Sequence, residues 1–263
     1  MHPTVWEYLK GMLVYIVQGW HNNGIASGDW SDEGVEFHMM KVHEYQLRVT
    51  WCLWVALVAL GITGCNSVQA QVPEYSGTDP LATTQGKEVA VLAGGCFWGV
   101  DAVFKHVKGV KQVVSGYSGG NANTAEYEEV NAGETGHAES VQISFDPAEI
   151  TFAQLLRVFF SVATNPTELN RQGPDEGTQY RSVIFYANDA QKEVALAYID
   201  QLNNAHAFRH RIVTQVVSLT RFYAAEDYHQ NYLELHPDNP YIVFNDLPKL
   251  RALKKEFPGL YKQ

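Results

Sequence analysis

The chain has 263 residues, of which 46% are hydrophobic and 18% charged, and a formal net charge of −10. This composition is typical of a globular protein with one catalytic domain and an N-terminal extension. The acidic balance excludes the nucleic-acid-binding classes that need a basic stripe to neutralise phosphates. The three cysteines, Cys52, Cys65 and Cys96, form no CxxC or Cys/His grouping of the kind that binds zinc, so we expect no metal.

An export signal is indicated ahead of the domain. Lys41 and Arg48 give a positive segment, residues 49–61 are apolar and uncharged, and Ile62-Thr63-Gly64-Cys65 closes the run. This pattern resembles a bacterial lipoprotein signal, in which the cysteine is lipidated and becomes the mature N-terminus. An uncleaved membrane anchor is the alternative, although the apolar run is short for a transmembrane helix.

The signal divides the N-terminal third of the chain. Residues 1–39 show no periodicity and are interpreted as the product of an upstream start, with the true start at Met39 or Met40. We interpret residues 40–64 as the signal segment and residues 65–87, rich in Ser, Thr, Gly, Gln and Pro, as a flexible tether. We therefore expect a protein anchored to the bacterial cell envelope through a lipidated cysteine, facing the periplasm or the exterior. If the signal interpretation is wrong, the protein is cytoplasmic.

The domain proper is predicted from 88 to 263. Apolar and β-branched runs predict strands at Val89–Ala93, Val110–Ser115, Ser140–Phe145, Arg181–Tyr186 and Val213–Leu219. Helical periodicity predicts helices over Trp98–His106, Phe152–Val162, Ala190–Ala207 and Ala224–His236. This order predicts an α+β fold with a ferredoxin-like split βαβ core, in which helices cover one face of an antiparallel or mixed sheet. The connections 116–136, 164–180 and 237–263 are predicted to be long functional loops.

The run G-G-C-F-W-G, Gly94 to Gly99, places Cys96 on a turn between a predicted strand and a predicted helix. The unpaired N–H groups and the positive dipole end of a first helical turn favour thiolate over thiol, so we expect a nucleophile in an open position. The alternative is an inert buried cysteine. Phe97 and Trp98 follow with apolar surface suited to a small uncharged group, or they are simply core aromatics.

Three further motifs follow in the chain: T-G-H-A-E from Thr135 to Glu139, G-T-Q-Y-R-S from Gly177 to Ser182, and A-E-D-Y-H-Q from Ala225 to Gln230. With these four motifs in this order, residues 88–262 resemble the A-type peptide methionine sulfoxide reductases. The resemblance implies an oxidoreductase that reduces methionine S-sulfoxide, protein-bound or free, and so repairs oxidised proteins and peptides.

The resemblance also implies roles for individual residues. Cys96 attacks the sulfoxide sulfur and Glu139 protonates its oxygen. Tyr127 and Tyr180 donate hydrogen bonds to that oxygen. Phe97 and Trp98 hold the terminal methyl group of the substrate, and Asp175 contacts the substrate backbone. Because sulfoxide oxygen leaves only when protonated, Glu139 must carry a proton near neutral pH, which burial among aromatic rings favours.

The chain departs from the family pattern in its cysteines. Many members form a disulfide with a second cysteine near the residue matching Tyr127 or in a C-terminal tail, whereas here Asn131 stands four residues after Tyr127 and no cysteine follows Cys96. We therefore expect no cofactor other than an external thiol, small or thioredoxin-like, which reduces the sulfenic acid directly. The protein is expected to be a monomer.

Rival classes of cysteine enzyme fit less well. A phosphatase loop needs Arg six residues after the cysteine, where this chain has Ala102, and a thioredoxin site needs Cys three residues on, where it has Gly99. A non-catalytic thiol sensor is a further alternative. His137 and His229 are interpreted as hydrogen-bonded scaffold residues. The basic residues Lys249, Arg251, Lys254 and Lys255 are interpreted as the solvated side of a helix.

Overall fold

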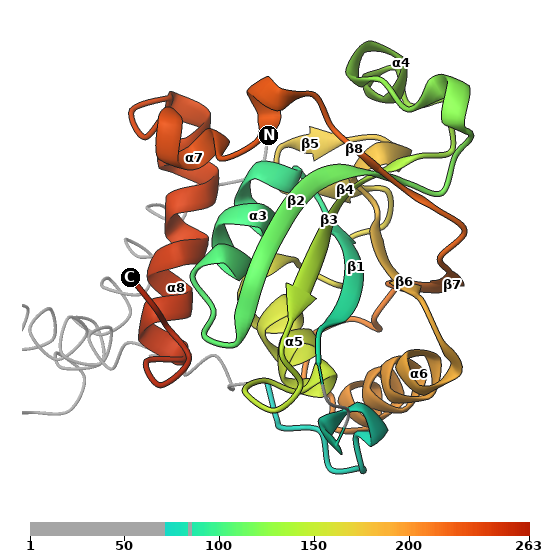
Figure 1. The fold of residues 1–263 in the computed structure, drawn as a ribbon, viewed down its shortest axis with the longest axis vertical. Coiled ribbons are helices and arrows are strands. Elements are labelled where there is room, and N and C mark those ends of the chain that lie inside the picture. The colour runs from blue at the N-terminus through green and yellow to red at the C-terminus, as the bar shows by residue number, and fades with distance from the viewer. Residues whose placement is uncertain (1–71, 84–85) are drawn as a thin grey trace, which may run out of the picture. The chain divides into compact units, whose positions relative to one another are not determined.

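The computed structural model describes residues 72–83 and 86–263 (Figure 1). The predicted upstream segment 1–39, the signal segment 40–64 and Cys65 lie outside the described residues. Within the part of the chain that is described, no helix is both long enough and apolar enough to cross a bilayer.

A six-stranded mixed sheet forms the centre of the fold, in the order β7-β6-β1-β3-β2-β8 (Figure 1). The strands are β1 (Glu88–Gly94), β2 (Val110–Ser118), β3 (Ala138–Phe145), β6 (Ser182–Tyr186), β7 (Gln215–Ser218) and β8 (Phe222–Ala224). All neighbours pair antiparallel except β6 and β7, which are parallel. A separate two-stranded hairpin is formed by β4 (Arg171–Gln172) and β5 (Asp175–Glu176).

Helices connect the inner strands as the split βαβ prediction requires. The α-helices are α3 (Phe97–Lys105), α4 (Tyr127–Asn131), α5 (Phe152–Val158), α6 (Asp189–Asn204), α7 (Tyr232–Leu235) and α8 (Leu247–Glu256). Helix α3 joins β1 to β2, and α5 joins β3 to β6. Thr151 begins α5 with a capping box to Gln154, and the Asn188 side chain caps α6. The α+β fold and its ferredoxin-like core are therefore confirmed.

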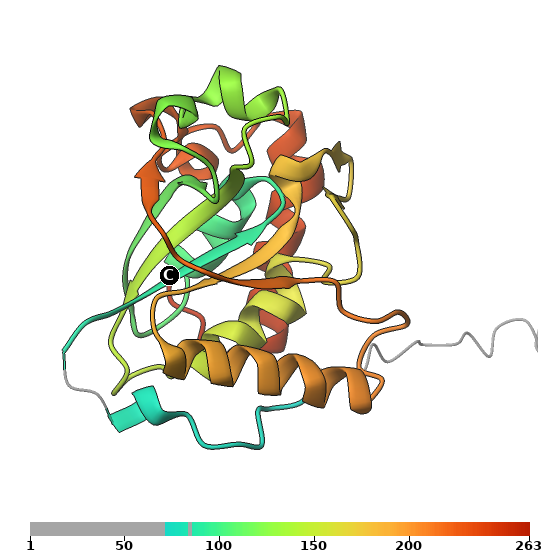
Figure 2. The same ribbon diagram turned by 90° about the vertical axis from the view of Figure 1, so that its right-hand side faces the viewer.

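Strand alternation places a core on each face of the sheet. Ala90 and Leu92 of β1 pack in the larger core with α3, α5 and α6, whereas Val91 and Ala93 point to the opposite face. That second face carries a smaller cluster, covered by the connection between β7 and β8, which crosses it in Figure 2. The larger core fixes α3, whose first turn carries Cys96.

The prediction of one helix over Ala224–His236 is wrong. The segment contains the end of β8, a 3-10 turn η5 (Asp227–His229) and the short α7. Asn231 adopts a left-handed conformation with φ 56°, and the Gln230 side chain exchanges two hydrogen bonds with the backbone of Ser115 in β2. These contacts to the sheet override the local helical periodicity.

The segment ahead of β1 packs on the domain where it is described. Arg157 Nε donates to the carbonyl of Val72 at 2.9 Å, and the Tyr198 hydroxyl donates to that of Pro73 at 2.6 Å. Asp79 accepts a hydrogen bond from the backbone N–H of Ala153 in the first turn of α5. Residues 72–83 are thus part of the folded body, whereas the sequence predicted a flexible tether over 65–87. The predicted C-terminal loop likewise contains the π-helical turn η6 (Ile242–Asp246) and α8.

Candidate active site

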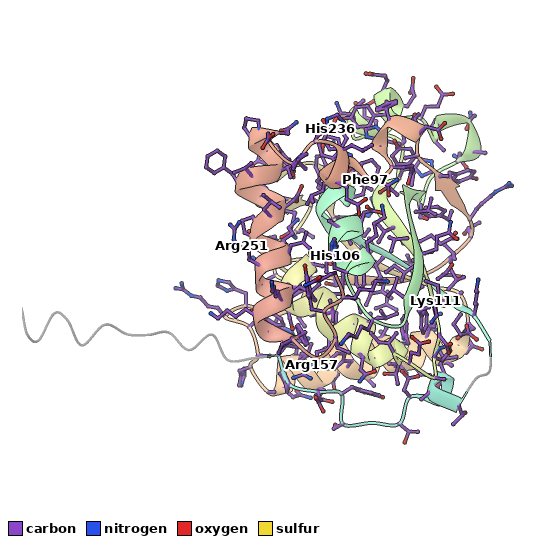
Figure 3. All side chains as sticks on the ribbon, turned by 60° about the vertical axis from the view of Figure 1, so that its left-hand side comes forward. Phe97, His106, Lys111, Arg157, His236 and Arg251 are labelled. Carbon is purple, nitrogen blue, oxygen red and sulfur yellow. The ribbon has the colours of Figure 1, made fainter. Side chains whose placement is uncertain are left out.

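The turn between β1 and α3 buries its cysteine. Gly95 has φ +93°, and a Cβ built there would lie 2.4 Å from Cγ of Gln172, so only glycine fits. Cys96 is the N-cap residue of α3 and is only 6% exposed. Its side chain makes no capping hydrogen bond to the first helical turn. Figure 3 shows Phe97 at the beginning of α3.

Burial raises the pKa of Cys96 well above its ordinary value. The carboxyl groups of Glu139 and Asp246 raise it further, while the N–H of Trp98 and the ammonium group of Lys249 act in the opposite direction. The expectation of an open turn that favours thiolate is therefore corrected. The helix dipole is present, but desolvation of the sulfur and two nearby carboxyl groups outweigh it.

Glu139 lies directly beside this turn. It is the second residue of β3, is 3% exposed, and its Oε2 accepts a hydrogen bond from the backbone N–H of Phe97 at 3.0 Å. Burial raises its pKa to about 8, against the effect of the hydrogen bond from Phe97 and of the neighbouring Cys96 thiol. The carboxyl group is therefore mostly protonated at neutral pH, as the proton-donor role requires.

Two phenols complete the polar side of the site. Tyr127 begins α4 and Tyr180 ends the 3-10 turn η4 (Thr178–Tyr180). Burial raises both pKa values, that of Tyr127 to about 12, and the charges of Glu139 and Cys96 raise them further. Both hydroxyls stay protonated and can donate hydrogen bonds. The Tyr180 hydroxyl reaches the side chain of Asn131 at 3.4 Å.

The aromatic wall is held in place by its own contacts. The Trp98 indole N–H donates to Nδ1 of His229 at 3.2 Å, and the indole ring stacks on Tyr232 with centroids 3.7 Å apart. Phe97 is buried, with its ring centroid 5.0 Å from that of His229. Since the indole has both a hydrogen bond and a stacked ring, its orientation is fixed before any ligand binds.

Asp175 lies at the edge of the same wall. It begins β5, is half-buried, and accepts a hydrogen bond from the Tyr241 hydroxyl. Burial raises its pKa, which this hydrogen bond and Lys249 partly oppose. The Tyr241 ring meets Trp98 edge-on at 5.9 Å. The structure thus brings together Cys96 and all the other predicted site residues in the described part of the chain.

Sequence reasoning missed several supporting residues. Glu226 accepts hydrogen bonds from the Tyr117 hydroxyl at 2.9 Å and from the backbone N–H of Tyr127 at 2.8 Å. The signal for it was the A-E-D-Y-H-Q motif, which also contains His229. Asp246 had no such signal, because it follows Cys96 by 150 positions and only the fold brings it to α3. His137 is hydrogen-bonded to the backbone of Gly120 and Asn121, as its scaffold interpretation predicted.

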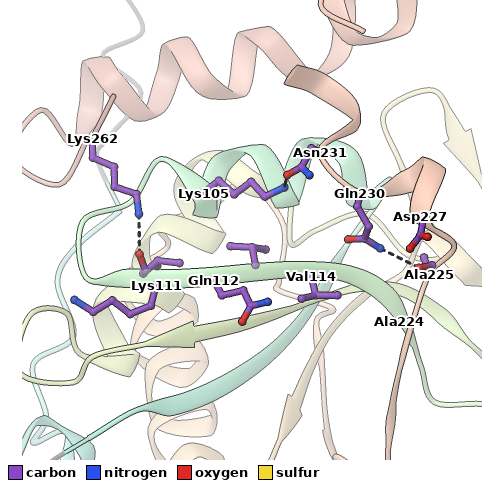
Figure 4. A pocket seen from close by; sticks show the side chains of 12 residues that line it. Lys105, Lys111, Gln112, Val114, Ala224, Ala225, Asp227, Gln230, Asn231 and Lys262 are labelled. Carbon is purple, nitrogen blue, oxygen red and sulfur yellow. Dashed lines mark hydrogen bonds between the residues drawn. The ribbon is translucent and has the colours of Figure 1, made fainter. Parts of the chain in front are cut away.

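A pocket of about 510 Å³ lies elsewhere, along β2 (Figure 4). Its lysines already have partners: Lys105 pairs with Asp101, Lys111 with Glu149, and Lys262 donates to the carbonyl of Val110. None of the predicted site residues lines it. Among the described residues, no three His, Cys, Asp or Glu side chains gather as metal ligands.

A ferredoxin-like α+β core that presents a buried cysteine beside a neutral carboxyl group and two phenols defines a cysteine-dependent enzyme. Residues 88–259 match the family model for peptide methionine sulfoxide reductase. The chain is 58% identical over 178 residues to peptide methionine sulfoxide reductase MsrA 2 of Mesorhizobium japonicum, covering 68% of this chain and 91% of that protein. It is 51% identical over 185 residues to the MsrA 2 of Synechocystis sp., covering 70% and 86%.

Two solved structures agree with this match. Methionine sulfoxide reductase A of Corynebacterium diphtheriae aligns with a TM-score of 0.50 at 35% identity, covering 60% of this chain and 78% of that one. Reduced Mxr1 of Saccharomyces cerevisiae aligns with a TM-score of 0.52 at 31% identity, covering 64% and 93%. The chain belongs to the A-type peptide methionine sulfoxide reductase family, and its activity is that of a peptide-methionine (S)-S-oxide reductase.

Proposed function

We propose that Cys96 and Glu139 carry out the reduction as a pair. The observation that supports this is their proximity: the Glu139 carboxyl group accepts a hydrogen bond from the backbone N–H of Phe97, the residue after Cys96. Its pKa of about 8 lets it hold a proton at neutral pH. Glu139 therefore transfers its own proton to the sulfoxide oxygen. The carboxylate that this leaves accepts the proton that the Cys96 thiol loses as it attacks.

The step balances as a two-electron transfer. An S–S bond forms when the sulfur of Cys96 attacks the sulfoxide sulfur, and the S–O bond of the substrate breaks as the protonated oxygen leaves as water. Water then attacks the sulfur of Cys96, which breaks the S–S bond, releases methionine thioether and leaves Cys96 oxidised as sulfenic acid. Of the two protons that the thiol and Glu139 supply, one stays on the sulfenic oxygen and one returns to Glu139. Tyr127 and Tyr180 donate hydrogen bonds to the sulfoxide oxygen while charge develops on it.

The substrate is oriented by the other predicted residues. Phe97 and Trp98 hold the terminal methyl group, since this fixed aromatic wall offers no charge to it. Asp175, hydrogen-bonded to Tyr241, contacts the peptide backbone of an oxidised protein. The protein thereby repairs methionine oxidised in other proteins.

A reductase assay tests these roles. The full chain is given a methionine sulfoxide peptide as separate S and R epimers, with dithiothreitol as reductant. We expect turnover of the S epimer by the wild type and none by Cys96→Ser, because serine offers no sulfur to form the S–S bond. Turnover by Cys96→Ser, or failure on the S epimer, contradicts the proposal.

We further propose that an external thiol recycles the enzyme. Cys96 is the one cysteine among the described residues, and at the position of Asn131 this chain has an amide that accepts from Tyr180. A thiol, small or from a thioredoxin-like protein, attacks the sulfenic acid and releases water, and a second thiol frees Cys96. After one turnover without reductant, dimedone should label Cys96. Mass spectrometry that finds an internal disulfide instead overturns this proposal.

Anchoring is proposed from the sequence alone. We propose that Cys65 is lipidated after removal of residues 40–64, which holds the domain at the bacterial cell envelope. The intact mass of the native protein should correspond to a lipid-modified chain that begins at Cys65. A mature form that retains Met1 contradicts the proposal.

A further inference from the structure

A buried ion pair covers the first turn of α3, and the reaction described above does not use it. Asp246, the last residue of η6, is 0% exposed, and its Oδ1 accepts a hydrogen bond from Lys249 Nζ at 3.2 Å. The Lys249 side chain is only 19% exposed. The prediction that Lys249 lies on the solvated side of its helix is therefore wrong. Burial of two charges carries a desolvation cost, so the pair calls for an explanation beyond stability.

Gly99 shows how near the pair lies to the cysteine turn. A Cβ built at Gly99 would lie 2.1 Å from Asp246 Oδ1 and 2.7 Å from Lys249 Nζ. Gly99 is the third residue of the helix whose N-cap is Cys96, so both charges contact the turn that carries the positive dipole end. Within the described residues the second carboxyl oxygen of Asp246 is buried and has no hydrogen-bond partner.

We propose that Asp246 and Lys249 are positioning residues that set the local charge at the start of α3 and thereby decide when Cys96 ionises. Asp246 places a negative charge beside the first helical turn that follows Cys96, which opposes formation of the thiolate and so holds the resting residue as a thiol. Lys249 offsets part of that charge and limits its effect. The inference rests on the nucleophilic role proposed for Cys96 and adds a control of its protonation.

The electrostatic effects of the two residues have opposite signs. Asp246 raises the pKa of Cys96 and Lys249 lowers it. Other titratable groups also face this site from neighbouring elements, and none of them is altered in the variants below: Glu139 from β3, Asp175 from β5, Tyr127 from α4, Tyr180 from η4 and Tyr241 ahead of η6. A shift between variants therefore reports on the pair.

Alkylation of the thiol at different pH values tests the inference. The full chain is treated with iodoacetamide from pH 6 to 11, and mass spectrometry follows the peptide that contains Cys96, since Cys52 and Cys65 also react. We expect Asp246→Asn to lower the midpoint of the pH profile by on the order of one unit, and Lys249→Met to raise it by a similar amount. The midpoint of the double variant should lie between those of the single variants.

Two controls separate charge from structure. Lys249→Arg keeps the charge and should keep the wild-type midpoint, and Arg251→Met removes an exposed positive charge from the same helix (Figure 3) and should leave it unchanged. Shifts of both single variants in one direction, no shift in either, or an equal shift in Arg251→Met overturn the inference. If circular dichroism shows that Asp246→Asn does not fold, Lys249→Met against Lys249→Arg decides.

The readout is independent of turnover. Opposite shifts in a protein that does not reduce the sulfoxide would refute the proposed role of Cys96 and leave this inference standing. Normal reduction by a protein without the opposite shifts would refute this inference alone.

Discussion

Protonation of the Glu139 carboxyl group is coupled to folding. Its pKa is about 8 in the folded protein, against an ordinary value of 4.5 that the unfolded chain retains. As the pH rises from 4.5 to 8, the unfolded chain loses this proton first, so the folded state binds more protons. The stability that the neutral carboxyl group contributes is complete below pH 4.5 and is lost as the pH rises through about 8.

Replacing Glu139 by Gln should separate the two effects. We expect the rate to fall on the order of 10²- to 10⁴-fold, because the proton donor is gone. Above pH 8 the variant should unfold at higher urea than the wild type, because no buried charge remains. Wild-type turnover should fall as the pH rises through about 8. Rates and urea midpoints at pH 6 and 9 check this, with the exposed Glu134→Gln as control.

Single residues also mark the limit of the sequence as a guide. Cys96 and Glu139 lie in motifs, so their types and spacing indicated their chemistry. The protonation state of Cys96 could not be derived this way, because it depends on burial and on Asp246. The sequence showed that Lys249 is charged, but it did not show which way the side chain points. A shift of one helical turn decides whether its ammonium group meets solvent or α3.

The turn between β1 and α3 is the element on which the site depends. Its backbone at Gly95 is left-handed and packs against Gln172, whose amide group is itself hydrogen-bonded to Thr164 at 2.8 Å. A side chain at Gly95 would therefore push on a buried contact as well as strain the backbone. The position of Cys96 depends on the left-handed backbone at Gly95 and on the packing of that residue against Gln172.

Gly95→Ala should lower the stability by about 1–3 kcal/mol, the range for a strained backbone position. It should also reduce kcat, because Cys96 is displaced relative to Glu139. Gly86→Ala provides the matched control, since Gly86 has φ +103° but nothing within 4 Å of its added Cβ. Urea unfolding and the reductase assay measure both effects. Equal losses in the two variants would show that packing against Gln172 is unimportant.

Elements with a strong local pattern could be predicted, and those that depend on distant contacts could not. The five predicted strands and α5 were recognisable because their apolar spacing persists over several residues. The failed helix over 224–236 has similar periodicity, but Glu226 and Gln230 are committed to hydrogen bonds with the loop at Tyr127 and with β2. Such long-range bonds leave no trace in a short sequence window.

At the scale of the whole molecule, residues 72–83 are hydrogen-bonded to two helices, α5 and α6. Asp79 accepts from the backbone N–H of Ala153, one of the unpaired donors at the start of α5, while Val72 and Pro73 accept from α5 and α6. This segment lies outside the family match, which begins at residue 88. Its contribution should be to stability and not to chemistry.

Asp79→Ala should therefore lower the free energy of unfolding by about 0.5–2 kcal/mol, as expected for loss of a helix cap. The kcat should remain that of the wild type, because Asp79 contacts no site residue. Glu193→Ala, an exposed change on α6, is the control and should have little effect on either quantity. A large loss of kcat in Asp79→Ala would show that this segment reaches the active site.

The 6% exposure of Cys96 has a consequence for the life of the enzyme under oxidative stress. Once reduction of the sulfoxide has left sulfenic acid on Cys96, a peroxide molecule must reach this buried sulfur to convert it irreversibly to sulfinic acid. Side chains that exclude peroxide also restrict the incoming thiol, so protection against permanent inactivation slows regeneration.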